Sequence, residues 1–397
     1  MPDLTIILAV ASLVLLGVST WNALCWATLA APAAESEPRS VAVLVPARNE
    51  EANLPACIEA ALAQGDVVRE VLVYDDHSSD GTARVVQDYA QRDPRTRLIE
   101  PSILEPGWCG KPFACAQLAK AATAPILLFV DADTRLHAGA AARIVGELHR
   151  RRVGLIAPWP NLEAHSLWEQ ILMPMLNVVV FSTYPAPLGV SRQDPALGLA
   201  HGACLAFSRE GYQNAGGHEA VRNEIFEDTL LARHLRSRGT ATACLDGRGA
   251  VSVRMYNSFA GIWRGFQKNF YPAFASGITF WAFMLLHAAV YLLPFVLLVV
   301  HPTLWVYVSV GALLSMRTVL ALRFGQPLWP VLLHPLAECV LLGIGFSSWF
   351  RVRAGRGVTW KGRTYLGGAQ AIGGRRPGEP VLQSPLPEVS SLARRAE

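Results

Sequence analysis

Two long stretches of this 397-residue chain contain no charged residue, and they restrict the fold more than any motif does. They run from Leu4 to Ala34 and from Asn269 to Met316. About 20 apolar residues span a bilayer, so the first stretch predicts one membrane helix and the second predicts two, separated at His301-Pro302. A cleaved signal peptide is the alternative for the first stretch. The missing basic segment at its start favours a retained anchor.

The residues between these stretches alternate between apolar, β-rich segments and segments of helical periodicity. No Gly-x-Gly-x-x-Gly follows any of the apolar segments, which argues against a dinucleotide-binding fingerprint. The alternation predicts an α/β fold with a doubly wound, mostly parallel sheet. The expected strands are residues 41–45, 67–74, 97–100 and 126–130, and the expected helices are residues 50–63 and 82–92.

Pairs of carboxylates follow two of the expected strands. Asp131 and Asp133 come directly after one strand, and Asp75 and Asp76 follow another. Ligands bind at the carboxyl ends of the strands in such a sheet, and neighbouring strands lie about 5 Å apart, so both pairs can serve one ligand. Carboxylates in this position suit a hydrated Mg²⁺ or Mn²⁺ that also binds substrate phosphate. A surface Asp-Ala-Asp turn is the alternative.

The distribution of charge argues against one class of partner. The net charge is +4, but the residues from Arg351 to Glu397 include nine Arg or Lys and three Asp or Glu, which leaves −2 for the rest. A nearly neutral body argues against nucleic acid as a partner. The seven cysteines form no Cys-x-x-Cys pair, and their odd number argues against a disulfide framework or a zinc site.

Five motifs follow one another between residues 45 and 228. They are Val-Pro-Ala-Arg-Asn-Glu-Glu (45–51), Asp-Asp-His-Ser-Ser-Asp-Gly-Thr (75–82), Gly-Lys (110–111), Asp-Ala-Asp (131–133) and Glu-Asp (227–228). Their order and spacing resemble those of family 2 glycosyltransferases. The resemblance implies the GT-A fold, a nucleotide-sugar donor, usually UDP-linked, and inversion at the anomeric carbon. Residues 107–112 and 254–259 resemble a membrane branch of the family that includes carotenoid-acid and hopanoid-associated enzymes.

The resemblance also implies roles for individual residues. Asp228 would be the catalytic base, and Lys111 would approach the donor or its leaving phosphate. Asp133 would be the principal ligand of a divalent cation, Mg²⁺ or Mn²⁺, and Asp131 would support the cation or the donor. The nucleotide-sugar site would comprise Pro46, Ala47, Glu50, Asp75, Asp76, Lys111 and Asp131.

Elementary chemistry agrees with these roles. A departing diphosphate gathers negative charge, which a cation and a lysine stabilise, and an attacking hydroxyl needs a carboxylate within hydrogen-bond reach. Two plain alternatives stay open. Asp228 begins an expected helix that ends at Gly239. A carboxylate stabilises the start of a helix whether or not it takes part in catalysis. Lys111 could be an ordinary solvated lysine.

Four residues are expected on the acceptor side of the site. Glu227 adjoins the predicted base, and His201 precedes an apolar strand, although a structural role for this histidine is equally compatible with the sequence. Trp168 belongs to the apolar stretch 167–188, which is either core or an interfacial helix. Trp263 lies in a mixed aromatic and basic segment typical of the level of lipid headgroups.

The predicted function is transfer of a sugar from a nucleotide-sugar to a membrane lipid such as a carotenoid, a hopanoid or another glycolipid precursor. A polyprenyl-phosphate glycosyltransferase and a non-catalytic nucleotide-binding membrane scaffold are the alternatives. A processive polysaccharide synthase is disfavoured, because Gln-x-x-Arg-Trp is replaced by Trp263-Arg264 alone. The expected regions are an anchor (1–34), a catalytic domain (40–258), an interfacial segment (259–275), membrane helices (276–351) and a basic, largely disordered tail (352–397).

The expected location is the cell inner membrane, with several crossings and a cytoplasmic catalytic domain. The basic tail is also expected in the cytoplasm. The chain must then cross the membrane an even number of times between the two, so residues 330–350 are predicted to be re-entrant or interfacial. Glu338 within them should face protein or water, because a charge in the bilayer is costly. Arg317 is expected to extend towards the interface.

Overall fold

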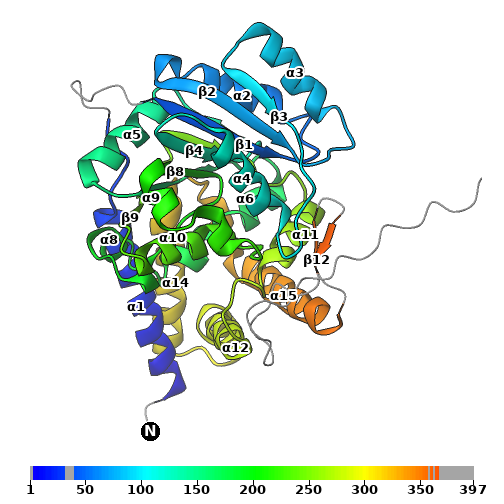
Figure 1. The fold of residues 1–397 in the computed structure, drawn as a ribbon. Coiled ribbons are helices and arrows are strands. Elements are labelled where there is room, and N and C mark those ends of the chain that lie inside the picture. Colours follow the sequence, from blue (N-terminus) through cyan, green and yellow to red (C-terminus); the bar gives the residue numbers. More distant parts are fainter. Residues whose placement is uncertain (1–2, 32–39, 356–357, 361–362, 366–397) are drawn as a thin grey trace, which may run out of the picture.

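A computed structural model describes residues 3–31, 40–355, 358–360 and 363–365, so most of the predicted tail lies outside the described residues. A seven-stranded sheet with the strand order β3-β2-β1-β4-β8-β6-β9 forms the centre of the upper part of the molecule (Figure 1). Its strands are β1 (Val41–Ala47), β2 (Val68–Asp75), β3 (Thr96–Ile99), β4 (Ile126–Val130), β6 (Leu155–Trp159), β8 (Cys204–Ser208) and β9 (Thr242–Asp246).

The sheet is mostly parallel, as predicted, with one strand reversed. β1, β2, β3 and β4 run parallel to one another, and β6 runs parallel to β9, whereas β8 is antiparallel to both β4 and β6. Val130 at the end of β4 pairs with Cys204 at the start of β8. The residues that precede β8 therefore lie at the edge where β1, β2 and β4 end, which is where ligands bind in such sheets.

Helices cover both faces of this sheet. The β1 side chains Val41, Val43 and Val45 pack into one core with helices α2, α3 and α5, while Ala42 and Leu44 pack into a second core with α4 and α10. Successive residues of a strand point to opposite faces, so a strand buried on both sides is apolar at every position. The helices are α2 (Leu54–Leu62), α3 (Thr82–Arg92), α4 (Gly110–Ala121), α5 (Ala140–Arg151) and α10 (Glu227–Ser237).

Shorter elements complete the catalytic part. A three-stranded sheet has the order β5-β10-β7, and β11 pairs with β12. The stretch 167–188 forms helices whose apolar residues are mostly buried, which favours its reading as core. These elements are η1 (Gly65–Val67), β5 (Thr134–Leu136), β7 (Asn161–Leu162), α6 (Leu167–Leu172), α7 (Pro174–Phe181), α8 (Ala186–Ser191), η2 (Pro195–Leu197), α9 (Arg209–Asn214), η3 (Gly217–Val221), β10 (Val251–Val253), α11 (Phe259–Asn269), β11 (Val358–Trp360) and β12 (Arg363–Tyr365).

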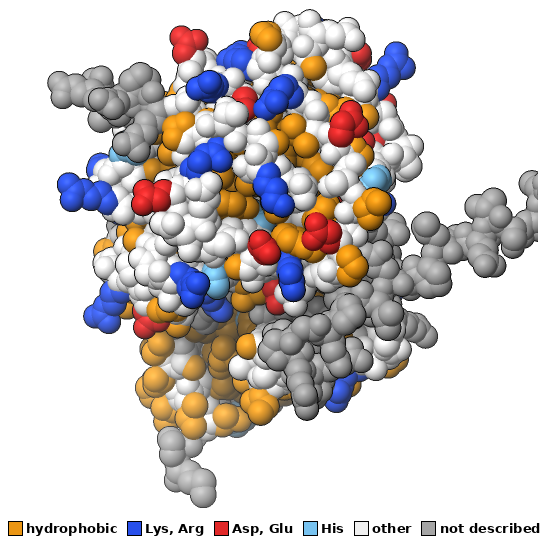
Figure 2. Space-filling model, in the orientation of Figure 1, with side chains coloured by type: hydrophobic (Ala, Val, Ile, Leu, Met, Phe, Trp, Pro, Cys, Tyr) orange, Lys and Arg blue, Asp and Glu red, His pale blue; other side chains and the backbone are white. Residues whose placement is uncertain are grey.

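In the part of the chain that the structure describes, four helical segments are long and apolar enough to cross a membrane. Apolar side chains cover the lower part of the molecule, where α1 and α14 lie, whereas charged side chains are scattered over the upper part (Figures 1 and 2). The segments are α1 (Leu4–Cys25), the continuous run of α12 (Gly277–Leu286), η4 (His287–Leu292) and α13 (Leu293–Val300), then α14 (Leu304–Phe324), and finally η5 (Trp329–Leu333) with α15 (His334–Arg353).

The first of these helices is docked against the catalytic part by specific hydrogen bonds. The Asn22 side chain donates to the carbonyls of Phe181 and Tyr184, each at 2.7 Å, and Trp26 Nε1 donates to the Cys244 carbonyl at 3.0 Å. Arg323 of α14 forms an ion pair with Asp246, 2.6 Å from N to O. The apolar core is continuous from the sheet into these helices, so the sheet and the long apolar helices pack as one unit.

Two charged residues inside the helical part contact other protein groups. Glu338 is fully buried and its Oε2 lies 3.0 Å from His287 Nδ1, which confirms the expectation that this residue faces protein. Arg317 is also buried, at 3% exposed, and its Nη1 donates to Met175 Sδ of α7 at 2.9 Å. Its expected extension towards the interface stays a prediction.

An ion pair joins the start of α6 to the segment after β10. Both Glu169 carboxylate oxygens accept hydrogen bonds from Arg254, each at 3.0 Å, and Glu169 also completes a capping box with Ser166. Glu169 is fully buried, which by itself would raise the pKa of its carboxyl. The hydrogen bonds from Arg254 and Ser166 outweigh burial and lower that pKa to about 2.

We expect Arg254→Met to destabilise the protein by about 2 kcal/mol, because a buried carboxylate loses its charged partner. Thermal unfolding in detergent measures the effect. Arg264→Met is the control, because Arg264 is exposed on the nearby helix α11. This change should leave the midpoint of thermal unfolding unchanged. Equal midpoints for both variants would contradict the role of this ion pair.

Candidate active site

A cavity of about 660 Å³ opens at the edge of the sheet where β1, β2 and β4 end. Most residues predicted for the site line it, although they come from six separate segments of the chain. The predicted residues that line the cavity are Pro46, Ala47, Glu50, Asp76, Lys111, Asp131, Asp133, His201, Glu227 and Asp228.

Lys111 lies at the centre of the site, between two carboxylates. Its Nζ is 2.9 Å from Asp131 Oδ1 and 3.1 Å from Glu227 Oε1. Burial would lower the pKa of this ammonium group, but Asp131 and Glu227 hold the pKa above its ordinary value. The lysine therefore stays charged, and it joins the start of α4, the end of β4 and the start of α10. Glu227, predicted for the acceptor side, is thus an ion-pair partner of this lysine.

Asp228 faces the same cavity one residue further along α10. Its two oxygens accept hydrogen bonds from the backbone N–H groups of Gly202 and Thr229, each at 2.7 Å. A methyl group on Gly202 would lie 3.1 Å from Lys111 Nζ and 3.2 Å from Asp228 Oδ2, so only glycine leaves both side chains in place without adjustment. Burial, and secondly the neighbouring Glu227 carboxylate, raise the pKa of Asp228 to about 7.

His201 is buried beside this centre, with its ring edge-to-face against Trp159 at 5.1 Å. Its Nδ1 accepts a hydrogen bond from the Ala203 N–H at 3.2 Å, so the ring proton of the neutral form is on Nε2. Burial lowers the pKa of this histidine to about 4. The ring is therefore neutral at physiological pH. It stabilises the local backbone through the hydrogen bond from Ala203, and it also lines the cavity.

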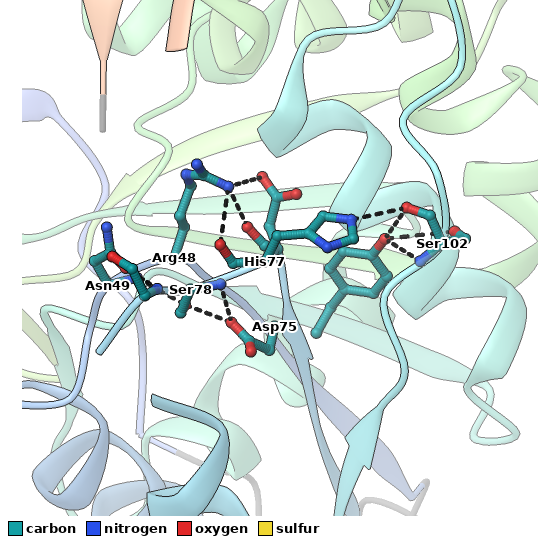
Figure 3. A network of polar contacts seen from close by, with 9 residues as sticks. Arg48, Asn49, Asp75, His77, Ser78 and Ser102 are labelled. Atoms are coloured by element: carbon teal, nitrogen blue, oxygen red, sulfur yellow. Dashed lines mark hydrogen bonds and ion pairs between the residues drawn. The ribbon is translucent and has the colours of Figure 1, made fainter. Parts of the chain in front are cut away.

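Polar contacts hold the chain at the ends of β1 and β2, at one edge of the cavity (Figure 3). Asp75 accepts hydrogen bonds from the N–H and hydroxyl of Ser78, and it does not appear among the described residues that line the cavity. Arg48 donates to the carbonyls of Asp76 and His77. His77 has a left-handed backbone, with φ 52°, so the chain turns sharply here and presents Asp76 to the cavity.

Trp168 and Trp263 lie elsewhere. Phe259 stands between them, with ring centroids 4.8 Å from Trp168 and 5.9 Å from Trp263, and neither tryptophan appears among the described cavity-lining residues. Part of the apolar wall comes from the stretches 167–188 and 259–275, to which these tryptophans belong, whereas the part from α12 and α15 was not predicted. The helical segments that form this wall are α7, α11, α12 and α15, through Met175, Leu176, Val179, Val180, Ile262, Phe266, Phe270, Phe283, Ala337, Val340, Leu341 and Ile344.

The donor set fits a divalent cation that is shared with substrate. Asp131 and Asp133 follow β4 and both line the cavity, and their oxygens are the hard ligands that Mg²⁺ and Mn²⁺ prefer. Among the described residues, no group of three or more His, Cys, Asp or Glu is arranged to hold a metal ion. A cation here would therefore take its other ligands from water and from the substrate phosphates.

Comparisons with known proteins agree with this geometry. Residues 42–216 match the family model of glycosyl transferase family 2. This segment is similar to family 2 glycosyl transferases, and it covers less than half of the chain. It ends before α10, so the Asp228 segment and the long apolar helices lie outside the matched residues.

Curated relatives align with more of the chain than the family model does. The 4,4'-diaponeurosporenoate glycosyltransferase of Staphylococcus haemolyticus is 28% identical over 241 residues, 58% of this chain but only 61% of the relative. The enzyme of the same name from Staphylococcus aureus strain USA300 is 27% identical over 346 residues, 82% of this chain and 88% of the relative. A mannosyltransferase from Pyrobaculum calidifontis, solved with GDP-Man and Mn²⁺, covers 88% of this chain and 97% of its own at 20% identity and a TM-score of 0.52. This likeness confirms the predicted GT-A fold.

If Asp228 serves as a base, kcat/KM should fall about tenfold per pH unit below about pH 7, because only the deprotonated carboxylate accepts a proton. Asp228→Asn should lose roughly 10²–10⁴ of the rate and should also lose this acid limb. The exposed α3 residue Asp88, changed to Asn, is the matched control. An unchanged acid limb in Asp228→Asn would assign the titration to another group.

Proposed function

We propose that this glycosyltransferase is a membrane-bound, inverting enzyme that moves a sugar from a nucleotide-sugar, predicted to be UDP-linked, to a lipid acceptor. One observation carries the proposal. A single cavity extends from the acidic ends of β1, β2 and β4 to the apolar faces of the membrane helices α12 and α15. A polar donor and an apolar acceptor can therefore meet at Lys111 and Asp228 without either leaving its own environment.

The residues of the cavity can be assigned separate roles in the proposed reaction. Asp228 takes the proton of the acceptor as its oxygen attacks the anomeric carbon. Lys111, fixed by Asp131 and Glu227, lies near the leaving diphosphate and offsets its charge. A divalent cation at Asp133 and Asp131 would supply further stabilisation of that charge. Asp76 and Glu50, with Pro46 and Ala47, bind the nucleoside at the ends of β1 and β2.

The names of the relatives support an apolar acceptor, since diaponeurosporenoate is a carotenoid acid. The two alternatives make different predictions. A polyprenyl-phosphate glycosyltransferase would tolerate loss of Asp228, because a phosphate acceptor needs no strong base. A non-catalytic scaffold would bind the nucleotide-sugar without transfer or hydrolysis. Such a scaffold would not need the buried Asp228 carboxyl with its raised pKa.

The membrane topology belongs to the same proposal. At one end of the last helical segment, Trp329 Nε1 donates to Gln170 Oε1 of α6 at 2.9 Å. At the other end, Ser348 Oγ accepts from the N–H of Tyr271 at 3.0 Å, just after α11. Both ends of the segment thus contact the catalytic side. This supports an interfacial or re-entrant η5–α15, with the catalytic domain and the C-terminus both in the cytoplasm of an inner-membrane protein.

The proposal predicts dependence on a divalent cation. Asp133→Asn should lose most of the turnover with Mg²⁺ or Mn²⁺ while its unfolding midpoint stays near that of the wild type. Assays with purified protein, with and without EDTA, measure this. Full turnover in excess EDTA would contradict the cation requirement.

The apolar wall predicts the effect of filling it. Val340→Trp should raise KM for the lipid roughly tenfold, which corresponds to about two lost CH₂ contacts of about 0.8 kcal/mol each. Nucleotide binding, measured by calorimetry, should not change. Leu336→Trp, on an exposed face of the same helix, is the control. A higher nucleotide Kd in Val340→Trp alone would mean that this wall serves the donor.

The topology is checked by a reporter fused after Arg363 in cells. A signal specific to the cytoplasm is expected, because an interfacial α15 leaves two crossings between the catalytic domain and the C-terminus. A reporter after His301, between α13 and α14, should give the opposite result and serves as the control. A periplasmic signal after Arg363 would require α15 to cross the membrane fully.

A further inference from the structure

A pair of a carboxylate and an imidazole is buried inside the helical part. Glu338 of α15 and His287 of η4 are 0% and 1% exposed, and Glu338 Oε2 lies 3.0 Å from His287 Nδ1. The other carboxylate oxygen, Oε1, has no hydrogen-bond partner among the described residues. A polar group left partly unsatisfied costs free energy, and apolar residues of similar size are often equally stable in such a place. Stability alone therefore does not account for the pair.

His287 lies directly behind a residue of the apolar wall. The centroid of its ring is 4.1 Å from that of Phe283 and 4.3 Å from that of Tyr291. The three residues are spaced four apart, so their rings follow one another along one side of the helical run. Phe283 lines the cavity, whereas His287 and Tyr291 do not appear among the described lining residues. The imidazole ring thus supports the phenyl ring from behind.

The far end of this stack of rings is fixed as well. The Tyr291 hydroxyl lies 2.6 Å from Ser182 Oγ, just after α7, and the Tyr291 carbonyl accepts a hydrogen bond from His334 Nε2 of α15 at 3.2 Å. The segment η4 is a π-helix, a form that occurs mostly as a short interruption of α-helices and frequently at functional sites. The stack is therefore attached to α7 and to α15, and both of these helices line the cavity.

Phe283 belongs to a group of three phenyl rings that line the cavity and contact one another. Its ring centroid is 5.7 Å from that of Phe270 and 5.2 Å from that of Phe274. The hydrogen bond between Glu338 and His287 therefore connects this aromatic group to α15. The residues of α15 that line the cavity recur at the spacing of one helix face, and they are Ala337, Val340, Leu341 and Ile344.

Resting on the proposed function, we infer that His287 and Glu338 are positioning residues for the lipid acceptor. His287 holds the Phe283 ring in the cavity wall, and Glu338 holds His287 relative to the aliphatic face of α15. Both residues act through Phe283 and do not touch the substrates. The proposed nucleoside site is formed by other elements, at the ends of β1 and β2, so binding of the donor should not depend on this pair.

The first variant removes the ring and keeps the hydrogen bond. In His287→Asn the amide nitrogen takes the place of Nδ1, so Glu338 keeps a partner, and the unfolding midpoint in detergent should stay near that of the wild type. KM for the lipid acceptor should rise roughly two- to tenfold, because an aromatic contact is lost, while kcat and the Kd of the nucleotide-sugar stay unchanged. The matched control is His301→Asn, at an exposed histidine between α13 and α14.

The assay uses the purified full-length protein in lipid vesicles, with UDP-glucose or GDP-mannose as the donor. The acceptors offered are diaponeurosporenoate, a long-chain isoprenoid alcohol and a diacylglycerol, and KM is measured for the one that the wild type glycosylates fastest. Transfer to none of these lipids by the wild type would overturn the proposed function, and the inference with it.

Further variants separate positioning from a general loosening of the fold. Phe283→Leu should raise the same KM by a similar factor, and combining it with His287→Asn should have little further effect, because both changes remove one contact. Glu338→Gln keeps a hydrogen bond to His287 and should leave KM within about twofold of the wild type. Glu338→Leu breaks that hydrogen bond and should raise KM as His287→Asn does.

The outcomes that would overturn the inference differ from the one that overturns the proposed function. They are an unchanged lipid KM in His287→Asn, an equal rise in its nucleotide-sugar Kd, or effects of His287→Asn and Phe283→Leu that multiply. A large fall in the unfolding midpoint of His287→Asn would assign the ring to stability and would also overturn the inference. Each of these results would leave lipid glycosylation standing.

Discussion

The ion pairs of Lys111 with Asp131 and Glu227 hold the site together. They connect the start of α4, the end of β4 and the start of α10, which are far apart in sequence. A half-buried ammonium group needs carboxylate partners, and the two carboxylates need the ammonium group to offset their mutual repulsion. Because Asp228 follows Glu227 directly, the same contacts fix where the proposed base faces the cavity.

The membrane helices form part of the catalytic unit and not only its attachment. Asn22 and Trp26 join α1 to the catalytic part, and Arg323 joins α14 to the end of β9. The apolar core continues through this junction without a gap. An amphiphilic acceptor must keep its chain in an apolar environment while its head reacts, and walls formed by α12 and α15 meet that requirement directly beside the polar centre.

Some buried polar groups in the helical part are paired with other polar groups, as Lys111 is at the site. Glu338 pairs with His287, and the Tyr291 hydroxyl lies 2.6 Å from Ser182 Oγ of the catalytic part. In an apolar environment a polar group without a partner costs several kcal/mol, so these contacts fix how η4 and α15 pack. The position of α15, in turn, sets the shape of the apolar wall.

The sequence by itself determined the elements, because their signals are local. Alternation of apolar segments placed β1, β2 and β4, and the carboxylates after them marked the ligand-binding edge. Only the tertiary structure decided which other residues come together at this edge. The antiparallel β8 brings His201 and Gly202 to Asp228, and α15 supplies the far wall of the cavity, whereas Trp168 and Trp263 pack around Phe259. Strand direction and helix placement depend on long-range packing, which leaves no period or motif in the chain.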